Sequence, residues 1–248
     1  MTSSPKPGEP WLAGLGEAVW RADALGGTPG ATLSSGHLAL DQVLPGGGWP
    51  LDALSEVSQP PGLHGEWRLL LPVLLRLQQT GSGALVLVGP PHVPFGPALQ
   101  AQGLAVQRLL WVNPSQMQAC LWAAEQALRC AGVLAVLAWL PQDLRVRPEQ
   151  LRRLQLAAQS YGKPLFAMRP AQAQGESSPA VLRLLLAPLP GQPAGQAQGT
   201  DGLQLQVQVL KRRGPPLAQP LQLAGRQGRL VAGLSIGLAL AARPAPPG

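Results

Sequence analysis

The sequence is poor in charge and in cysteine. Charged residues make up only 12% of the 248 residues, which is about half the usual share. The two cysteines, Cys120 and Cys130, lie in an apolar stretch with helical periodicity. Their spacing fits neither a zinc site nor a disulfide framework. We therefore expect both to be reduced core residues of a cytoplasmic protein.

Long apolar runs and catalytic motifs are also missing. The polar first ten residues lack the apolar centre of a signal peptide. The longest late apolar run, residues 230–242, is shorter than the roughly 20 residues that a membrane-spanning helix needs, so we expect no membrane association. The sequence has no G-x-S-x-G motif. Its three histidines, His37, His64 and His92, fit no metal-binding or catalytic spacing, and we expect them to be core or loop residues.

Positive charge is in excess. Nineteen Lys and Arg residues oppose 12 Asp and Glu residues, which gives a net charge of +7. A basic protein favours acidic partners such as nucleic acid, an anionic membrane surface or an acidic protein face. A soluble basic protein with no nucleic-acid role is the alternative. Glycine (30) and proline (28) are abundant, which predicts long loops.

The apolar pattern predicts an α/β fold. Short apolar runs alternate with helical patterns, which indicates a mainly parallel sheet with helices on both faces. The expected strands are residues 53–58, 84–89, 108–112, 133–140 and 164–168, and the expected helices are residues 66–79, 95–102, 115–130 and 148–160. Residues 181–187 and 203–210 have no helix between them, and the second run alternates strictly. We expect them to be antiparallel strands that extend the sheet, with residues 217–223 as a further edge strand.

Three segments resemble one family. Residues 33–50, LSSGHLALDQVLPGGGWP, resemble the segment that precedes the first core strand of RecA, and the LPGGGWP end is most similar to the ImuA family. Residues 19–22 (VWRA) and 210–214 (LKRRG) also resemble ImuA sequences. The resemblance implies a RecA-like domain at residues 33–224. Residues 1–32 would then form an N-terminal tail, amphipathic helix and linker, and residues 225–248 a C-terminal tail.

The resemblance also implies a phosphate loop, G-x-x-x-x-G-K-[ST], after the first core strand. If Gly65 takes the second glycine position, Pro60 takes the first, Glu66 the lysine and Trp67 the hydroxyl, with Gly62 inside the loop. Pro60 has no N–H to donate, and Trp67 cannot bind Mg²⁺. Glu66 replaces attraction with repulsion, which costs about 4 kcal/mol for charges some 4 Å apart at an effective dielectric near 20. The sequence therefore predicts a degenerate site, no nucleotide cofactor and no enzyme.

Two further positions agree with this prediction. In the family a catalytic glutamate follows the second core strand, but residues 84–89 continue into Pro90-Pro91-His92. An aspartate that organises Mg²⁺ ends a later core strand, but here that strand ends in Ala138-Trp139-Leu140. Asp143 follows shortly after, and we interpret it as a solvated loop carboxylate.

If no nucleotide binds, the function belongs to surfaces. Four arginines follow the strand at residues 133–140 and are candidates to contact DNA backbone or an acidic partner: Arg145, Arg147, Arg152 and Arg153. Lys211, Arg212 and Arg213 follow the alternating strand and are candidates for the same role. Trp11 and Trp20 are candidate anchors in the N-terminal helix. For each group, a solvated face or packing within the domain is the alternative.

The resemblance implies an accessory protein of SOS-induced translesion DNA synthesis. Its partners would be RecA, the polymerase-like protein ImuB and, through ImuB, an error-prone polymerase, with weak DNA backbone contact as a further possibility. One alternative is a cell-division inhibitor of the SulA type, which targets FtsZ. SulA chains are shorter and end before an extension such as residues 203–223, which counts against this alternative. A working RecA-like ATPase is the third hypothesis.

Overall fold

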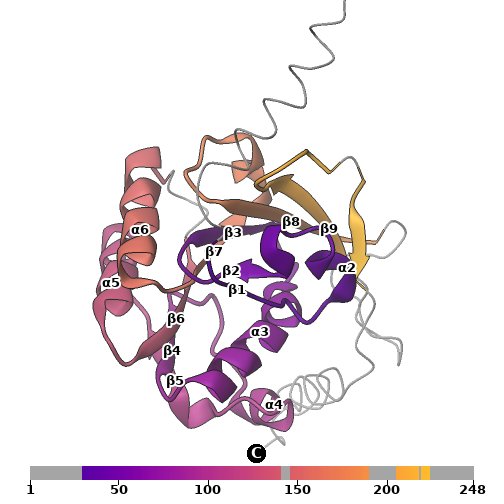
Figure 1. The fold of residues 1–248 in the computed structure, drawn as a ribbon. Coiled ribbons are helices and arrows are strands. Elements are labelled where there is room, and N and C mark those ends of the chain that lie inside the picture. Colours follow the sequence, from indigo (N-terminus) through magenta and orange to yellow (C-terminus); the bar gives the residue numbers. More distant parts are fainter. Residues whose placement is uncertain (1–29, 141–145, 190–204, 218, 224–248) are drawn as a thin grey trace, which may run out of the picture.

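A central sheet of eight strands organises the protein (Figure 1). The computed structural model describes residues 30–140, 146–189, 205–217 and 219–223. The strand order is β10-β9-β8-β3-β7-β6-β4-β5. The strands are β3 (Leu54–Gln59), β4 (Ala84–Val88), β5 (Leu109–Val112), β6 (Val133–Trp139), β7 (Leu165–Pro170), β8 (Leu182–Pro188), β9 (Leu205–Lys211) and β10 (Leu221–Leu223).

The strand directions confirm the expected fold class. Strands β3 to β8 are parallel, β9 runs antiparallel to β8, and β10 runs antiparallel to β9. One detail differs from the expectation, because β8 is antiparallel only to β9 and is parallel to β3 on its other side. The reason is that residues 171–181, which include the 3-10 helix η3 (Ala171–Gly175), return the chain to the end of the sheet where the parallel strands begin, so that β8 runs in the same direction as β7.

Helices cover both faces of the parallel part of the sheet. Helices α3 (Glu66–Thr80) and α4 (Gly96–Ala101) pack on one face, and α5 (Met117–Arg129) and α6 (Pro148–Tyr161) lie side by side on the other (Figure 1). Successive side chains of a strand point to opposite faces. Leu137 therefore packs in the core below α3, whereas Val136 packs in the core below α5 and α6. This two-sided burial explains why β4 and β6 are apolar throughout.

The LSSGHLALDQVLPGGGWP segment forms a small unit on the α3 side. It contains the antiparallel pair β1 (Thr32–Leu33) and β2 (Trp49–Pro50), with α2 (Leu38–Asp41) and η1 (Pro45–Gly47) between them. Asp41 Oδ1 accepts a 2.7 Å hydrogen bond from the backbone N–H of Ser35. Trp49 is fully buried and packs edge-on against Phe166, with ring centroids 5.2 Å apart. A Cβ at Gly48 would lie 2.2 Å from the Leu33 carbonyl oxygen, so only glycine fits there.

The environments of the two cysteines differ. Cys120 is buried in α5, as expected, but Cys130 is exposed at the end of that helix, so its prediction as a core residue is wrong. Cys130 directly follows the last residue of α5, and β6 begins three residues later at Val133, so the helical periodicity does not extend to Cys130. Among the described residues, no helix is both long and apolar enough to cross a membrane.

Candidate functional site

The loop from Pro60 to Gly65 joins β3 to α3 at the carboxyl end of a central strand. In RecA-like folds this is the place of the phosphate loop, and the structure puts the residues of the sequence register there. The N–H of Leu63 donates to the Pro60 carbonyl over 3.2 Å. Gly62 has φ of 77°, a conformation that favours glycine. Gly65 is packed tightly, because a Cβ there would lie 3.1 Å from the side chains of Leu186 and Leu205.

The carboxylate of Glu66 is buried at the start of α3. The residue is 2% exposed. Its Oε2 accepts a 2.8 Å hydrogen bond from Gln59 Nε2, and its Oε1 accepts a 3.3 Å hydrogen bond from Trp139 Nε1. Gln59 also accepts a 3.2 Å hydrogen bond from the backbone N–H of Gly65 through Oε1. A negative charge is stabilised at a helix N-terminus, so the carboxylate suits this position without any ligand.

Two tryptophans close the same region. The rings of Trp67 and Trp139 have centroids 6.1 Å apart and are tilted by 37°. Trp139 therefore contacts both residues that follow Gly65, through its N–H to Glu66 and its ring to Trp67. The side chains that take the lysine and hydroxyl positions of a phosphate loop are engaged with this indole. The N–H groups of Gln59 and Trp139 at the N-terminus of α3 donate to the carboxylate of Glu66.

Two histidines lie beside this loop. His64 Nδ1 is 4.0 Å from Glu66 Oε1, and the rings of His64 and His92 meet edge to face with centroids 5.0 Å apart. His92 belongs to the turn after β4, and both histidines are exposed loop residues. Within the part of the chain that the structure describes, no group of three or more potential ligands could hold a metal ion.

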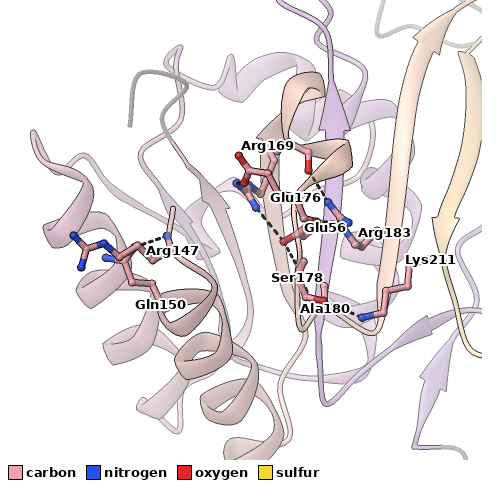
Figure 2. Close-up of polar contacts among 10 residues, drawn as sticks. Glu56, Arg147, Gln150, Arg169, Glu176, Ser178, Ala180, Arg183 and Lys211 are labelled. Atoms are coloured by element: carbon pink, nitrogen blue, oxygen red, sulfur yellow. Dashed lines mark hydrogen bonds and ion pairs between the residues drawn. The ribbon is translucent and has the colours of Figure 1, made fainter. Parts of the chain in front are cut away.

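The arginines after β6 lie around α6. Arg147 precedes the helix, and its backbone N–H donates to Gln150 Oε1 over 2.9 Å (Figure 2). Arg152 and Arg153 are exposed on α6. Arg153 is paired with Glu125 of α5, with Nε 2.6 Å from Oε2. Arg145 and Asp143 lie outside the described residues, as do Trp11 and Trp20.

The basic residues at the end of β9 are partly engaged within the domain. Lys211 Nζ donates to the Ser178 carbonyl over 2.9 Å. Burial lowers the pKa of Lys211, and the charge of Arg183 lowers it further. Arg212 donates to the carbonyls of Pro215 and Val43. Arg213 is exposed and makes no hydrogen bond or ion pair with the described residues, so a role in partner or DNA contact stays a prediction for Arg213 above all.

Strands β3, β7 and β8 carry a buried ionic network that the sequence patterns did not predict (Figure 2). Glu56 is fully buried and accepts a 2.7 Å hydrogen bond from Arg183 Nε and another of 2.7 Å from Ser178 Oγ. Arg169 lies 3.4 Å from Glu56 and 2.8 Å from Glu176. Single charges inside apolar strand patterns are the signal that could have revealed it. The network holds the segment between β7 and β8 against the sheet.

Comparison with known proteins shows the family of the chain. Residues 54–164 match the family model described as cell division inhibitor SulA. A cell division inhibitor SulA of Pectobacterium atrosepticum is 30% identical over 143 residues, which cover 58% of this chain and 81% of the relative. The chain belongs to the SulA family. The match runs from β3 to the start of β7 and so contains the Pro60–Gly65 loop and Glu66.

The chain is also similar to an ImuA protein and to a RecA protein. It is 33% identical to protein ImuA of Caulobacter vibrioides over 141 residues, which cover 54% of this chain and 56% of that protein. It is 30% identical to protein RecA of a Picosynechococcus strain over 103 residues, which cover 42% of this chain and 29% of RecA. The chain thus spans little more than half of the ImuA relative. The expected likeness to RecA is confirmed.

Proposed function

We propose that the chain is a non-catalytic, RecA-like accessory protein of the SOS response to DNA damage, which serves ImuA-type translesion synthesis by binding RecA, ImuB or both. One observation carries the non-catalytic part. The buried carboxylate of Glu66 stands at the start of α3 and accepts hydrogen bonds from Gln59 and Trp139.

This arrangement opposes nucleotide binding on two grounds. A triphosphate at the helix start would face the carboxylate of Glu66, a repulsion of about 4 kcal/mol at some 4 Å and an effective dielectric near 20. The N–H groups of Gln59 and Trp139 would also have to leave their acceptor, and a buried unpaired polar group costs about 1–3 kcal/mol. With no ATP chemistry, the chain acts through contacts with other macromolecules.

The ImuA type is favoured by the strands after residue 164, where the SulA match ends. Strands β8, β9 and β10 continue the sheet there, and β9 carries Lys211, Arg212 and Arg213 at its end. The sequence resemblance in residues 33–50 and 210–214 also points to ImuA. The alignment with the ImuA relative covers 54% of this chain and 56% of the relative. The alignment with the SulA relative covers 58% of this chain but 81% of the relative, so the SulA relative is the shorter protein.

The second candidate is an inhibitor of cell division of the SulA type, acting on FtsZ. The observation that favours it is the family match over residues 54–164, together with relatives of which the alignment covers 81% and 83%. Under this alternative, the nucleotide site would be equally unused, and the difference lies only in the partner.

Binding to purified partners separates the two candidates. Immobilised full-length chain is exposed in parallel to RecA, ImuB and FtsZ from the same organism, at physiological salt. We expect capture of RecA or ImuB and no capture of FtsZ. Capture of FtsZ alone would replace the proposal by the second candidate. Capture of none of the three would contradict both candidates.

A second measurement tests the non-catalytic part by itself. Calorimetric titration of the chain with ATP and Mg²⁺ should give no binding heat. The Glu66→Gln variant, which removes the charge and keeps the shape, serves as a comparison and should also give none, because Pro60 and Trp67 remain. Micromolar affinity in the unmodified chain would contradict the proposal, whatever the partners are.

A further inference from the structure

A groove between α5 and α6 combines positive charge with exposed apolar side chains. It lies on the face of the sheet opposite α3, so it is separate from the Glu66 site. The groove is an open hollow of about 370 Å³. The lining residues that matter for its chemistry are Glu125, Arg129, Arg152, Arg153, Leu156 and Tyr161.

Glu125 organises two of these arginines. Its carboxylate is only 6% exposed, and it lies 2.6 Å from Arg129 Nη2 and 2.6 Å from Arg153 Nε. Arg153 Nη2 also donates to it over 3.2 Å. The arginine side chains are themselves 48% and 68% exposed. A guanidinium has five N–H donors, so each arginine is held in place while donors remain for a ligand.

The charges of the groove add to a positive surface. One carboxylate pairs with two guanidinium groups, and Arg152, the residue before Arg153 on α6, adds a third cation. Glu149 of the first turn lines the groove as well, so the excess is one positive charge. Fixed guanidinium groups suit planar carboxylates, which they bind with two parallel hydrogen bonds.

Apolar side chains lie next to these cations. Leu156, which is 55% exposed, and Tyr161, which is 44% exposed, both line the groove. Trp122 is 62% exposed one turn before Glu125 on α5 but does not line the groove. Exposed aromatic residues beside arginine are the residue types enriched in protein interfaces. A ligand in the groove could pair a carboxylate with the arginines and pack an apolar side chain on Leu156 and Tyr161.

We propose that the α5–α6 groove binds an acidic peptide segment of a partner protein that carries a bulky apolar residue among its carboxylates. The carboxylates pair with Arg152 and with the free donors of Arg129 and Arg153, while the apolar side chain packs on Leu156 and Tyr161. Nucleic acid fits less well, because its phosphates and sugars offer no aliphatic side chain to cover the exposed Leu156. The inference rests on the proposed function only in that the chain acts by binding other proteins.

The test measures fluorescence anisotropy of a labelled synthetic peptide with the full chain. The peptide contains Asp and Glu around a Leu-Leu pair. Two control peptides replace the acids with Asn and Gln, or the Leu pair with Gly. A labelled oligothymidylate tests the nucleic-acid alternative. We expect binding of the acidic apolar peptide that weakens with salt and at least about tenfold weaker binding of each control peptide.

Two charge-reversed variants localise the binding. Arg152→Glu should weaken peptide binding at least about tenfold, because it loses a charge-assisted contact and adds repulsion. Arg76→Glu makes the same charge change at an exposed position of α3 on the opposite face and should bind as the unmodified chain does. Circular dichroism of both variants verifies folding.

Three results would overturn the inference: no peptide binding, equal losses in the two variants, or binding of the oligothymidylate that Arg152→Glu abolishes while the acidic peptide stays unbound. None of these depends on RecA, ImuB or FtsZ. Failure of the groove and failure of the proposed function can therefore be told apart.

Discussion

Trp139 donates its indole N–H to Glu66 Oε1 over 3.3 Å and so ties the end of β6 to the first turn of α3. The contact joins two segments that are 73 residues apart in the chain. In the register that the resemblance to RecA implies, Glu66 takes the lysine position of the phosphate loop, and Trp139 lies at the strand end where an aspartate would organise Mg²⁺. The proposal of a non-catalytic chain rests on this internal polar contact.

The first prediction concerns the stability that Glu66 provides. Glu66→Ala should lower the free energy of unfolding by about 3 kcal/mol, because Gln59 and Trp139 lose their acceptor in a buried place. Glu66→Gln should cost less, since one acceptor oxygen remains. Urea unfolding followed by tryptophan fluorescence measures both. Glu149→Gln, at an exposed glutamate in the first turn of α6, is the matched control and should cost about 1 kcal/mol or less, since only an exposed charge at a helix N-terminus is lost.

The second prediction compares two glutamates that each pair with two arginines. Glu56→Ala should destabilise the chain by about 3–5 kcal/mol, because Arg183 would keep a buried charge without its carboxylate and Arg169 would keep only its ion pair with Glu176. Glu125→Ala should cost about 1 kcal/mol or less, since Arg129 and Arg153 are exposed enough for water to solvate them. Chemical denaturation of the two variants gives the comparison. Similar losses in both would contradict the distinction between them.

The third prediction concerns thiol reactivity. Cys130 is exposed, whereas Cys120 is buried and its pKa is raised by burial, which keeps it as the less reactive thiol. A thiol reagent applied to the native chain should modify Cys130 quickly and Cys120 slowly. The Cys130→Ser variant should lose the fast phase and keep the slow one. Mass spectrometry after a short exposure identifies the modified residue.

The fourth prediction concerns alkaline pH. The pKa of Cys120 is higher in the folded chain than in the unfolded chain. Above the ordinary thiol pKa, the folded chain therefore keeps a proton on Cys120 that the unfolded chain has lost. Stability from this group is complete below that pH and falls above it. The Cys120→Ala variant should therefore lose less stability than the unmodified chain between neutral and alkaline pH. The lowered pKa values of Lys163 and Lys211 act in the opposite direction in both proteins and cancel in the comparison.

Much of the fold was predictable from the sequence, since strands buried on both faces leave runs such as residues 84–88 and 133–139 that are apolar throughout. The helices between them carry a clear helical period. The alternation in residues 205–211 predicted a strand with one buried face, and Leu205, Val207 and Val209 are indeed buried while Gln208 is exposed. These features follow from local patterns.

The parts that sequence patterns did not reveal depend on partners far apart in the chain. Glu56 and Arg183 are 127 residues apart, and Glu66 and Trp139 are 73 apart. Nothing local shows that these side chains meet. Likewise, the small unit of β1, α2 and β2 was identified by resemblance, but its structure depends on the fit of Trp49 against Phe166.

The surroundings of Glu66 also determine how well the chain would tolerate substitutions toward a phosphate loop. A lysine at this position would place an ammonium group beside the N–H groups of Gln59 and Trp139, so donors would face a donor. Pro60 and Trp67 would still lack the N–H and the hydroxyl that a phosphate loop supplies. A conventional phosphate loop therefore lies several substitutions away, and the first of these steps leads through a less stable protein.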